Sequence, residues 1–297
     1  MPTPAPWKGM VVAYQGEPGA YSEAAAQKHA PDATLLPCPS FEDVFRAVQG
    51  GTASLGVLPI ENSIGGTIHR NYDLLLEHPL HIVGDVELRV VHSLIALPGT
   101  TMDQIRQIYS HPQALAQCDR YLRNLPGVEV VASYDTAGSV KLIKDRQLAG
   151  AAAIASERAA AVFGLQVLQS GIQDFADNIT RFLVVSPAAV DAGTPTNKTT
   201  IVFTLSNEAG ALFKALSVFA LRGIDLTKLE SRPIPGRPWE YLFYVDLAVG
   251  AQDARCARAL AHLGEFAPML RNLGSYPSTL LPRSTTAPAP VAAGAQA

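Results

Sequence analysis

Residues 80–97 read LHIVGDVELRVVHSLIAL, and this stretch decides the fold of the first part of the chain. The segment is long and extended in character, and its alternation of side chains is clearest from Leu88 to Ala96, as is typical of a strand. It resembles a crossover more than one further strand of a single sheet. We therefore expect the sheet of this region to be split into two lobes.

On both sides of residues 80–97, short apolar runs alternate with helical patterns. Strands are predicted at 10–14, 55–60, 108–110, 128–131 and 151–155, and helices at 19–26, 41–48, 68–77, 112–125, from 136 onward and at 157–163. Two helix starts carry capping signals, Ser40 with Asp43 and Thr101 with Gln104. The alternation predicts an α/β domain with a mostly parallel sheet.

A second domain follows a stretch rich in Pro, Gly, Ala and Thr, which is typical of a linker. Strands are predicted at 199–205, 224–233, 239–249 and 269–273, helices at 211–221 and 253–266, and a hairpin turn at 235–238. This βαββαβ order predicts a ferredoxin-like unit. We expect a first domain at 10–187, a linker at 188–198, a second domain at 199–279 and a disordered tail at 280–297.

Composition excludes several classes of protein. Hydrophobic residues make up 48% of the chain and charged residues 16%, with a mean hydropathy of +0.14, which indicates a globular protein with large cores. No stretch reaches the roughly 18 apolar residues of a membrane span, and residues 1–8 resemble neither a signal peptide nor a transit peptide. A net charge of −3 without a basic cluster argues against nucleic acid binding. We therefore expect a cytoplasmic protein that binds neither membrane nor nucleic acid.

The cysteines and histidines do not suggest a metal or disulfide site. Cys38, Cys118 and Cys256 are far apart and form no Cys-x-x-Cys pair, which indicates neither a disulfide framework nor a thiolate metal site. His78 and His81 are close in sequence, but Pro79 between them prevents presentation on one helix. We expect no bound metal.

The motif Asn178-Ile179-Thr180-Arg181-Phe182 places a hydroxyl, a permanent cation and an aromatic side by side at the start of an apolar strand. A hydroxyl can pass a proton to a leaving oxygen, and a guanidinium can hold a carboxylate by two hydrogen bonds. The alternative is a plain strand start with a surface arginine. Other polar motifs at the ends of predicted strands favour the functional interpretation.

Two of these motifs follow predicted strands directly. Glu61, Asn62 and Ser63 come after the strand at 55–60, at an edge where ligands bind in open α/β sheets. The alternative is a loop that caps the next helix. Gln113 and Gln117 share one face of the helix that follows Ser110, and these groups can hold hydroxyls and carboxylates. An exposed polar helix face is the alternative.

Two further motifs begin helices. Residues 134–139 contain Asp135 and Thr136, either of which is also explained as a plain N-cap. Residues 15–22, which include Tyr21, lie where helix N–H groups attract anions, although a tight turn explains them equally well. They do not form Gly-x-Gly-x-x-Gly, which disfavours a dinucleotide site. Together the motifs supply hydroxyls, amides, one arginine and backbone N–H groups, a set that suits a small polyanionic substrate.

In order and spacing, these motifs and residues 152–156 resemble the prephenate dehydratase family, and the second domain resembles an ACT domain. The resemblance covers roughly residues 11–277. It implies a two-lobed catalytic domain of the periplasmic-binding-protein type and a ferredoxin-like regulatory domain. It also implies decarboxylative dehydration of prephenate to phenylpyruvate, in phenylalanine biosynthesis, without a cofactor.

The resemblance implies roles for individual residues. Thr180 is expected to protonate the departing ring hydroxyl, and Arg181 to help bind a substrate carboxylate. The catalytic group is expected to comprise Thr180, Arg181, Glu61 and Gln117, and the substrate-binding group Asn62, Ser63, Ser110, Thr136, Ala137, Tyr21 and Phe182.

The resemblance to ACT domains implies regulation by L-phenylalanine. The residues expected to bind it are Gly210, Ala211, Leu212, Glu230, Ser231 and Arg232. A homodimer or homotetramer is expected, because ACT domains usually pair edge to edge. The alternative is a ferredoxin-like unit used only for dimerisation.

The substrate and the enzymatic role both have alternatives. Residues 69–76 and 80–84 resemble the arogenate dehydratase branch, whose substrate carries an amine in place of the keto group. Two lobes around a cleft also describe non-enzymatic solute-binding proteins and amino-acid sensors. Neither of these needs a hydroxyl at Thr180.

Overall fold

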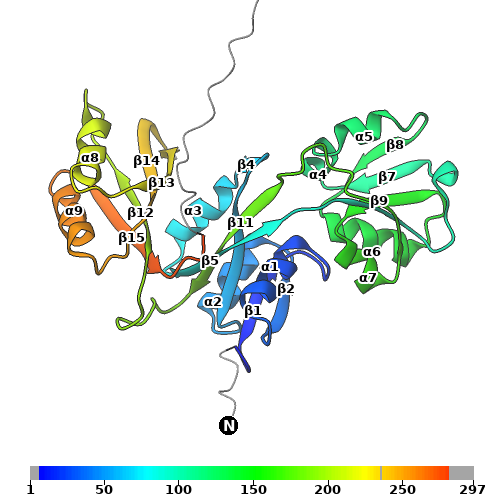
Figure 1. Ribbon diagram of the computed structural model, residues 1–297, viewed down its shortest axis with the longest axis horizontal. Coiled ribbons are helices and arrows are strands. Elements are labelled where there is room, and N and C mark those ends of the chain that lie inside the picture. Colours follow the sequence, from blue (N-terminus) through cyan, green and yellow to red (C-terminus); the bar gives the residue numbers. More distant parts are fainter. Residues whose placement is uncertain (1–6, 235, 281–297) are drawn as a thin grey trace, which may run out of the picture.

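The computed structural model describes residues 7–234 and 236–280. Three α/β units lie in a row along the long axis of the molecule (Figure 1), and each is built on its own sheet. The first lobe is in the middle, the second lobe lies on one side of it, and the C-terminal domain lies on the other. In this order the first lobe contacts both neighbours, and its sheet positions the candidate site.

The first lobe is a sheet of strand order β2-β1-β3-β11-β5, with β4 paired to β3. Strand β1 pairs in parallel with β2 and β3, whereas β11 is antiparallel to β3 and β5. The elements are β1 (Val11–Gln15), α1 (Tyr21–His29), β2 (Thr34–Cys38), α2 (Phe41–Gln49), β3 (Leu55–Asn62), β4 (Gly66–Thr67), α3 (His69–Glu77), β5 (His81–Arg89) and β11 (Ile179–Ser186).

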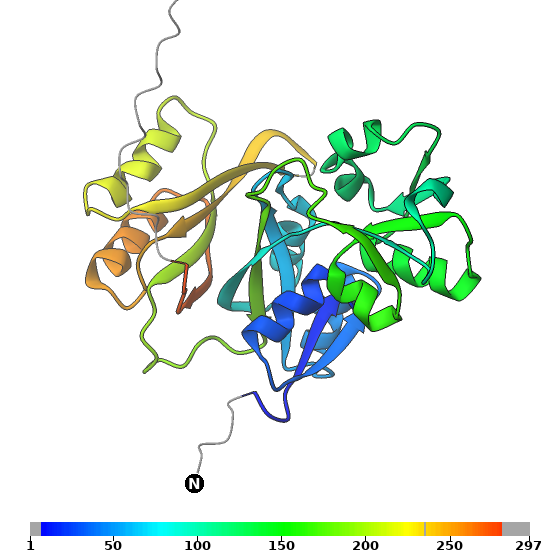
Figure 2. The same ribbon diagram turned by 45° about the vertical axis from the view of Figure 1, so that its right-hand side comes forward.

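The second lobe is a sheet of order β10-β6-β9-β7-β8. Its elements are β6 (Ser93–Ala96), the 3₁₀ turn η1 (Met102–Gln104), β7 (Gln107–Ser110), α4 (Pro112–Ala116), α5 (Asp119–Arg123), β8 (Glu129–Ala132), α6 (Thr136–Arg146), β9 (Ala151–Ala155), α7 (Glu157–Phe163) and β10 (Gln166–Ser170). The chain enters this lobe from β5 to β6 and returns from β10 to β11, as the turned view in Figure 2 shows. The crossover predicted from residues 80–97 is therefore confirmed.

The prediction of mostly parallel sheets is wrong, because both lobes are mixed. The connecting strands cause the difference: β11 runs antiparallel to both of its neighbours, and β6 runs antiparallel to β9 and β10. Strands β2 and β10 were not predicted, and both lie at the edge of their sheets. Pro37 weakens the strand pattern of β2, and two glutamines weaken that of β10. The helix predicted at 112–125 is divided into α4 and α5 at Cys118, which leaves helical geometry.

The C-terminal domain is a sheet of order β13-β14-β12-β15. Its elements are β12 (Lys198–Thr204), α8 (Ala211–Ala220), β13 (Leu226–Ile234), β14 (Arg237–Leu247), α9 (Ala254–Gly264) and β15 (Met269–Tyr276). They follow the predicted βαββαβ order. Residue 235 of the predicted hairpin turn, and the predicted tail from residue 281 onward, lie outside the described residues.

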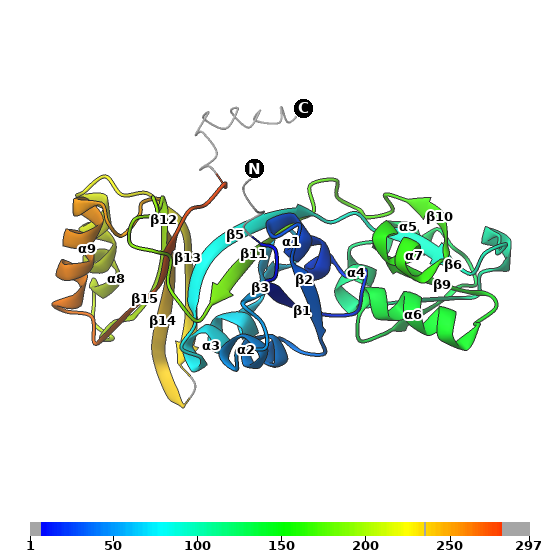
Figure 3. The same ribbon diagram turned by 90° about the horizontal axis from the view of Figure 1, so that it is seen from below.

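The helices and the first lobe cover opposite faces of the C-terminal sheet. Helices α8 and α9 lie on the outer face, and the inner face packs against the first lobe (Figure 3). One core cluster spans this contact and joins Leu242 and Tyr244 of β14 to Leu74 and Tyr72 of α3. Burying each such side chain contributes about 1.5–3 kcal/mol, so the C-terminal domain shares a hydrophobic core with the first lobe.

Candidate functional site

A cavity of about 260 Å³ lies between the two lobes. Strands β3 and β11 and the start of α1 form its first-lobe wall, and α4 and the start of α6 form its second-lobe wall. Its polar lining consists of Gln15, Tyr21, Ser22, Asn62, His92, His111, Gln113, Gln117, Tyr134, Asp135, Thr136 and Thr180. Within residues 7–234 and 236–280, no lysine or arginine lines it.

Strand register brings Thr180 and Asn62 together on the cavity side of the sheet. Thr180 of β11 lies opposite Asn62 of β3. The Asn62 side-chain amide donates to the Thr180 Oγ1 at 2.9 Å and to the Asn178 Oδ1 at 2.7 Å. Because an amide group has two hydrogens, these two shorter bonds take both of them, and the Ile179 carbonyl oxygen, at 3.3 Å from the same nitrogen, shares one.

The bond from Asn62 determines which way the Thr180 hydroxyl is used. Thr180 accepts a hydrogen bond, and no atom of the described chain accepts its own hydroxyl hydrogen. The side chain is only 7% exposed and lines the cavity. The hydroxyl hydrogen is therefore available to a molecule bound in the cavity.

Gln117 joins this pair to the second lobe. Its Nε2 donates to the Asn62 Oδ1 at 3.1 Å. Its Oε1 accepts from the Asn178 Nδ2 at 2.9 Å and lies 2.8 Å from the His92 Nε2. Asn178, Asn62, Gln117 and His92 are all buried, so the four side chains form a network in which each orients the next.

The network fixes the form of His92. Burial lowers its pKa, although the bond to Gln117 acts in the opposite direction, so the ring is neutral near pH 7. Since the Gln117 Oε1 can only accept, the His92 Nε2 carries the hydrogen. The Tyr21 hydroxyl donates to the Val91 carbonyl oxygen at 2.7 Å, and its oxygen lies 2.9 Å from the His92 Nδ1.

Two helix N-termini face the cavity. Tyr21 begins α1, Thr136 begins α6, and both residues line the cavity. N–H groups at such ends attract carboxylates, which offsets the absence of a cation in the described lining. Asp135 is the acidic residue in the described lining of the cavity. Its carboxylate accepts a hydrogen bond from the Glu17 backbone N–H at 3.2 Å.

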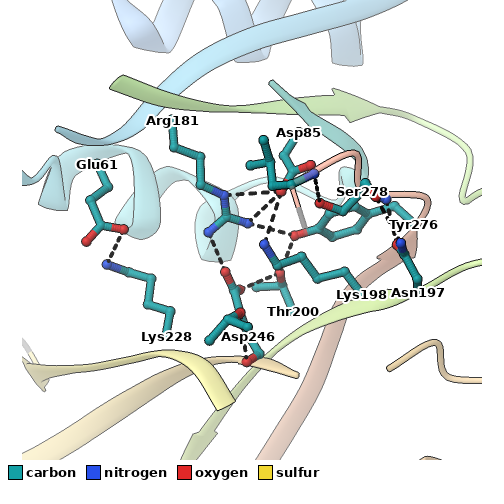
Figure 4. A network of polar contacts seen from close by, with 12 residues as sticks. Glu61, Asp85, Arg181, Asn197, Lys198, Thr200, Lys228, Asp246, Tyr276 and Ser278 are labelled. Atoms are coloured by element: carbon teal, nitrogen blue, oxygen red, sulfur yellow. Dashed lines mark hydrogen bonds and ion pairs between the residues drawn. The ribbon is translucent and has the colours of Figure 1, made fainter. Parts of the chain in front are cut away.

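The placement of Arg181 contradicts its expected role. Its side chain lies on the opposite face of β11 from Thr180, because neighbouring residues of a strand point to opposite sides. The guanidinium contacts the carboxylates of Asp85 and Asp246 and donates to the Tyr276 hydroxyl at 3.0 Å (Figure 4). Arg181 does not line the cavity, so the prediction that it binds a substrate carboxylate is corrected.

Glu61 is corrected for the same reason. It lies opposite Arg181 in the register of β3 and β11, and its carboxylate pairs with the Lys228 Nζ of the C-terminal domain at 3.0 Å. It is not part of the cavity lining. The two charged residues expected to be catalytic therefore face the C-terminal domain and not the cavity.

The other predicted residues divide into lining and supporting groups. Tyr21, Asn62, Gln117, Thr136, Thr180 and Phe182 line the cavity. Three predicted residues do not. The Ser110 hydroxyl donates to the Ile154 carbonyl oxygen at 2.6 Å, the Ser63 hydroxyl donates to the Asp177 carbonyl oxygen at 2.7 Å, and Ala137 belongs to the core of the second lobe. The side chains of these three residues support the walls, and their contacts with a substrate stay predictions.

Sequence reasoning missed His92 and gave Asn178 no role. His92 lies in the crossover, where a single buried histidine gives no signal of its partners. Asn178 stands next to the Thr180 motif, and its role depends on contacts with distant residues, Asn62 and Gln117.

The residues predicted to bind phenylalanine occupy two regions of the C-terminal domain. Gly210 precedes α8 with a left-handed φ of 82°, and Ala211 and Leu212 begin that helix. On β13, Glu230 accepts from the Thr67 hydroxyl at 2.9 Å, and Arg232 pairs with Asp73 at 2.8 Å, whereas Ser231 is exposed.

The profile of the prephenate dehydratase family matches residues 12–189. The chain belongs to this family. Over 276 residues this chain is 51% identical to "Arogenate dehydratase/prephenate dehydratase 2, chloroplastic" of Arabidopsis thaliana. The aligned region covers 90% of this chain and 72% of the relative. "Arogenate dehydratase 2" of Petunia hybrida is 50% identical over 90% of this chain and 71% of its own. The predicted family and enzyme class, a prephenate or arogenate dehydratase, are confirmed.

Solved structures resemble the whole fold. A prephenate dehydratase from Arthrobacter aurescens in complex with L-Phe has a TM-score of 0.80 at 35% identity, covering 95% of this chain and 93% of its own. GqqA, described as a novel type of quorum quenching acylase, has a TM-score of 0.83 at 36% identity. The match covers 91% of this chain and 98% of the GqqA chain. Among the described residues of this chain, no helix is long and apolar enough to cross a membrane.

Proposed function

We propose that the cavity between the lobes converts prephenate to phenylpyruvate, with Thr180 as the proton donor. The observation that carries this proposal is the bond from Asn62 to the Thr180 oxygen, which leaves the hydroxyl hydrogen for the substrate. Family membership supports the reaction, and the geometry supports the assignment of the donor. Among the predicted substrate-binding residues, Tyr21, Asn62, Thr136 and Phe182 line the cavity, and Gln117 of the predicted catalytic group lines it with Thr180.

In this reaction the bond between the ring and its carboxylate breaks, and the electron pair enters the ring as CO2 departs. The ring C–O bond breaks on the opposite side, and the leaving oxygen takes the proton from Thr180 and departs as water. The ring becomes aromatic, which drives the reaction. Asn62 stabilises negative charge that develops on the Thr180 oxygen, and solvent returns the proton. Assistance of this kind accelerates reactions by about 10²–10⁴-fold.

The neutral groups of the cavity have their own tasks. The N-termini of α1 and α6 hold the carboxylates of the substrate. Phe182 and Pro59 provide apolar surface for the ring. Burial of the amide network keeps water away from the acid and strengthens each hydrogen bond.

Asp135 favours a second candidate function, the dehydration of arogenate to phenylalanine. Arogenate carries an ammonium where prephenate carries a keto group. A carboxylate in a lining without a described cation attracts an ammonium and repels a dianion. The names of the Arabidopsis and Petunia relatives, which include arogenate dehydratase, support this candidate.

The experiment that tests the function is turnover of purified protein on prephenate and on arogenate, followed by the formation of phenylpyruvate and phenylalanine. We expect turnover of at least one substrate, and a loss of about 10²–10⁴-fold in Thr180→Ala, with unchanged circular dichroism. Near-normal turnover by Thr180→Ala would refute the proton donor. Turnover of neither substrate by the wild type would favour a binding protein, a sensor or a different reaction.

We infer that the C-terminal domain is an ACT domain that binds L-phenylalanine as an effector. The L-Phe complex of the Arthrobacter relative supports this inference. The binding groups are those predicted from sequence, at Gly210–Leu212 and Glu230–Arg232. Large exposed apolar side chains on the same domain, Phe213, Leu221, Leu229 and Trp239, support a homodimer or homotetramer. The cytoplasmic location remains a prediction, and the Arabidopsis relative is named as chloroplastic.

A further inference from the structure

A buried cluster of charges joins the first lobe to the C-terminal domain (Figure 4). Arg181 of β11 contacts the Asp85 carboxylate of β5 at 3.1 Å and the Asp246 carboxylate of β14. Lys198 of β12 contacts the same Asp85 oxygen at 3.2 Å. Tyr276 of β15 accepts from Arg181 at 3.0 Å. The cluster thus ties one strand of the cavity wall to three strands of the C-terminal sheet.

The charges of this cluster balance. Arg181 and Lys198 are cations, Asp85 and Asp246 are anions, and all four side chains are at most 11% exposed. Burial alone would raise the pKa of Asp246, but the neighbouring cations hold it below its ordinary value. Breaking such a pair leaves an uncompensated buried charge, so the cluster strongly favours one placement of β11 against the C-terminal sheet.

A second ion pair makes the same connection on the neighbouring strand. The Lys228 Nζ of β13 contacts the Glu61 carboxylate of β3 at 3.0 Å. Lys228 is 7% exposed and also lies 3.2 Å from the Thr67 hydroxyl of β4. Both contacts are to the paired strands β3 and β4, and the Glu61 side chain is 40% exposed, so the buried Lys228 joins the end of β3 to the C-terminal domain.

Both connected residues are neighbours of the cavity pair. Arg181 follows Thr180, Glu61 precedes Asn62, and the register places Arg181 opposite Glu61 and Thr180 opposite Asn62. One face of this two-strand segment holds the proton donor and its partner, and the other face is held by the C-terminal domain. A displacement of either strand changes the distance between Asn62 and Thr180.

We propose that Arg181 and Glu61 are positioning residues, through which the C-terminal domain holds Thr180 and Asn62 in their reactive geometry. The proposal rests on the proposed function for the meaning of that geometry. It makes the C-terminal sheet a structural part of the active site, in addition to any effector that it binds. The route has two parallel branches, Asp246 to Arg181 to Thr180, and Lys228 to Glu61 to Asn62.

The test uses the full-length protein and one variant per branch. Lys228→Gln releases Glu61, and Asp246→Asn weakens the hold on Arg181, while neither residue lines the cavity. We expect each variant to lower kcat by about tenfold and to change KM little, because misplacement of the acid affects the transition state. Arg181→Lys, which keeps the charge, should retain more turnover than Arg181→Gln.

Asp73→Asn is the matched control. It breaks another ion pair between the same two domains, to Arg232 of β13, but its own end is on α3 and not on β3 or β11. It should keep the wild-type kcat. If it lowers kcat as much as Lys228→Gln does, the effect is general loosening of the interface and the proposal is wrong.

The Thr180→Ala background separates positioning from stability. If Lys228 acts through Thr180, Lys228→Gln should cost no further turnover once the hydroxyl is absent. Equal losses in both backgrounds would overturn the proposal. A reading independent of turnover is the methyl resonance of Thr180 in a protein labelled at threonine methyl groups. It should move in Lys228→Gln and Asp246→Asn and stay in place in Asp73→Asn.

These readings distinguish the two proposals. A wild type that is inactive on both substrates would refute the proposed function, while the Thr180 resonance would still report on positioning. An active wild type with an unmoved resonance and an unchanged kcat in folded Lys228→Gln and Asp246→Asn would refute positioning alone.

Discussion

Asn62 donates a hydrogen bond to the hydroxyl oxygen of Thr180 at 2.9 Å, across the register of two antiparallel strands. The direction of this bond matters more than its length. A threonine that accepts from an amide keeps its own hydrogen free, and it gains a partner that stabilises negative charge on its oxygen. The protein thus makes a weak acid useful by orientation and not by a large change in its acidity.

The first prediction reverses this bond. Asn62→Asp replaces a donor by an acceptor of nearly the same shape, so Thr180 would donate its hydrogen to the new carboxylate and lose it for the substrate. We expect kcat to fall by about 10²-fold or more, at least as much as in Asn62→Ala. Steady-state kinetics would show this. Asn124→Asp, an exposed substitution of the same kind, should have no effect. A wild-type kcat in Asn62→Asp would contradict the assigned direction of the bond.

The second prediction concerns pH. Burial lowers the pKa of His92, so the folded protein favours the neutral ring. The resulting stability is fully present above about pH 6.5, the ordinary histidine pKa, and is lost as pH falls through the lowered value. We expect the Tm to decline as pH falls below about 6.5. The decline should be smaller in His92→Gln and unchanged in His262→Gln, which alters an exposed ring. Parallel curves for wild type and His92→Gln would exclude this origin.

The third prediction tests how substrate is chosen. Asp135→Asn removes the carboxylate of the cavity lining without changing its shape. If that carboxylate receives the ammonium of arogenate, the ratio of kcat/KM for arogenate to that for prephenate should fall by about tenfold or more. Competition between the two substrates measures this ratio directly. Asp145→Asn, exposed on the same helix, should leave it unchanged. An unchanged ratio in Asp135→Asn would remove the physical argument for arogenate.

The fourth prediction concerns the effector. Ser231→Ala and Glu230→Ala should weaken the response to L-phenylalanine, expressed relative to the turnover of each variant without it. Ser231 is exposed and makes this the cleaner variant, whereas Glu230 also accepts from Thr67 in the first lobe. Titration of turnover with L-phenylalanine, together with calorimetry, gives the affinity. An unchanged titration in both variants would place the effector elsewhere.

Sequence reasoning recovered those parts of the fold that local patterns determine. The crossover at residues 80–97 and the βαββαβ order follow from runs of apolar residues, and the Ser40 cap follows from a local hydrogen bond to the Asp43 N–H. The edge strands β2 and β10 were not predicted because their apolar patterns are weak. The antiparallel placement of β11 depends on contacts far along the chain, which no local pattern records.

For the site, the errors at Arg181 and Glu61 have one physical cause. Thr180 and Arg181 were assigned to the same cavity because they are adjacent in one motif. Adjacent residues of a strand face opposite sides, so only one of them can line the cavity. This alternation was available from the sequence. The partners on the other face, Asp246 and Lys228, were not, because they lie in another domain.

The last prediction tests the contact between the domains through the backbone. At Gly274 of β15, an added Cβ would lie 2.1 Å from the Ile82 carbonyl oxygen of β5 and 2.9 Å from its carbonyl carbon. Because these are main-chain atoms, Gly274→Ala must push the C-terminal sheet away from the first lobe, at a cost of about 1–3 kcal/mol. We expect a lower Tm and faster proteolysis of the linker. We also expect a lower kcat, because the displaced sheet carries the partners of Arg181. Gly264→Ala, whose Cβ would meet only a Leu270 methyl carbon at 3.8 Å, is the matched control. Gly274→Ala with a wild-type Tm would show that the two sheets tolerate separation at this point.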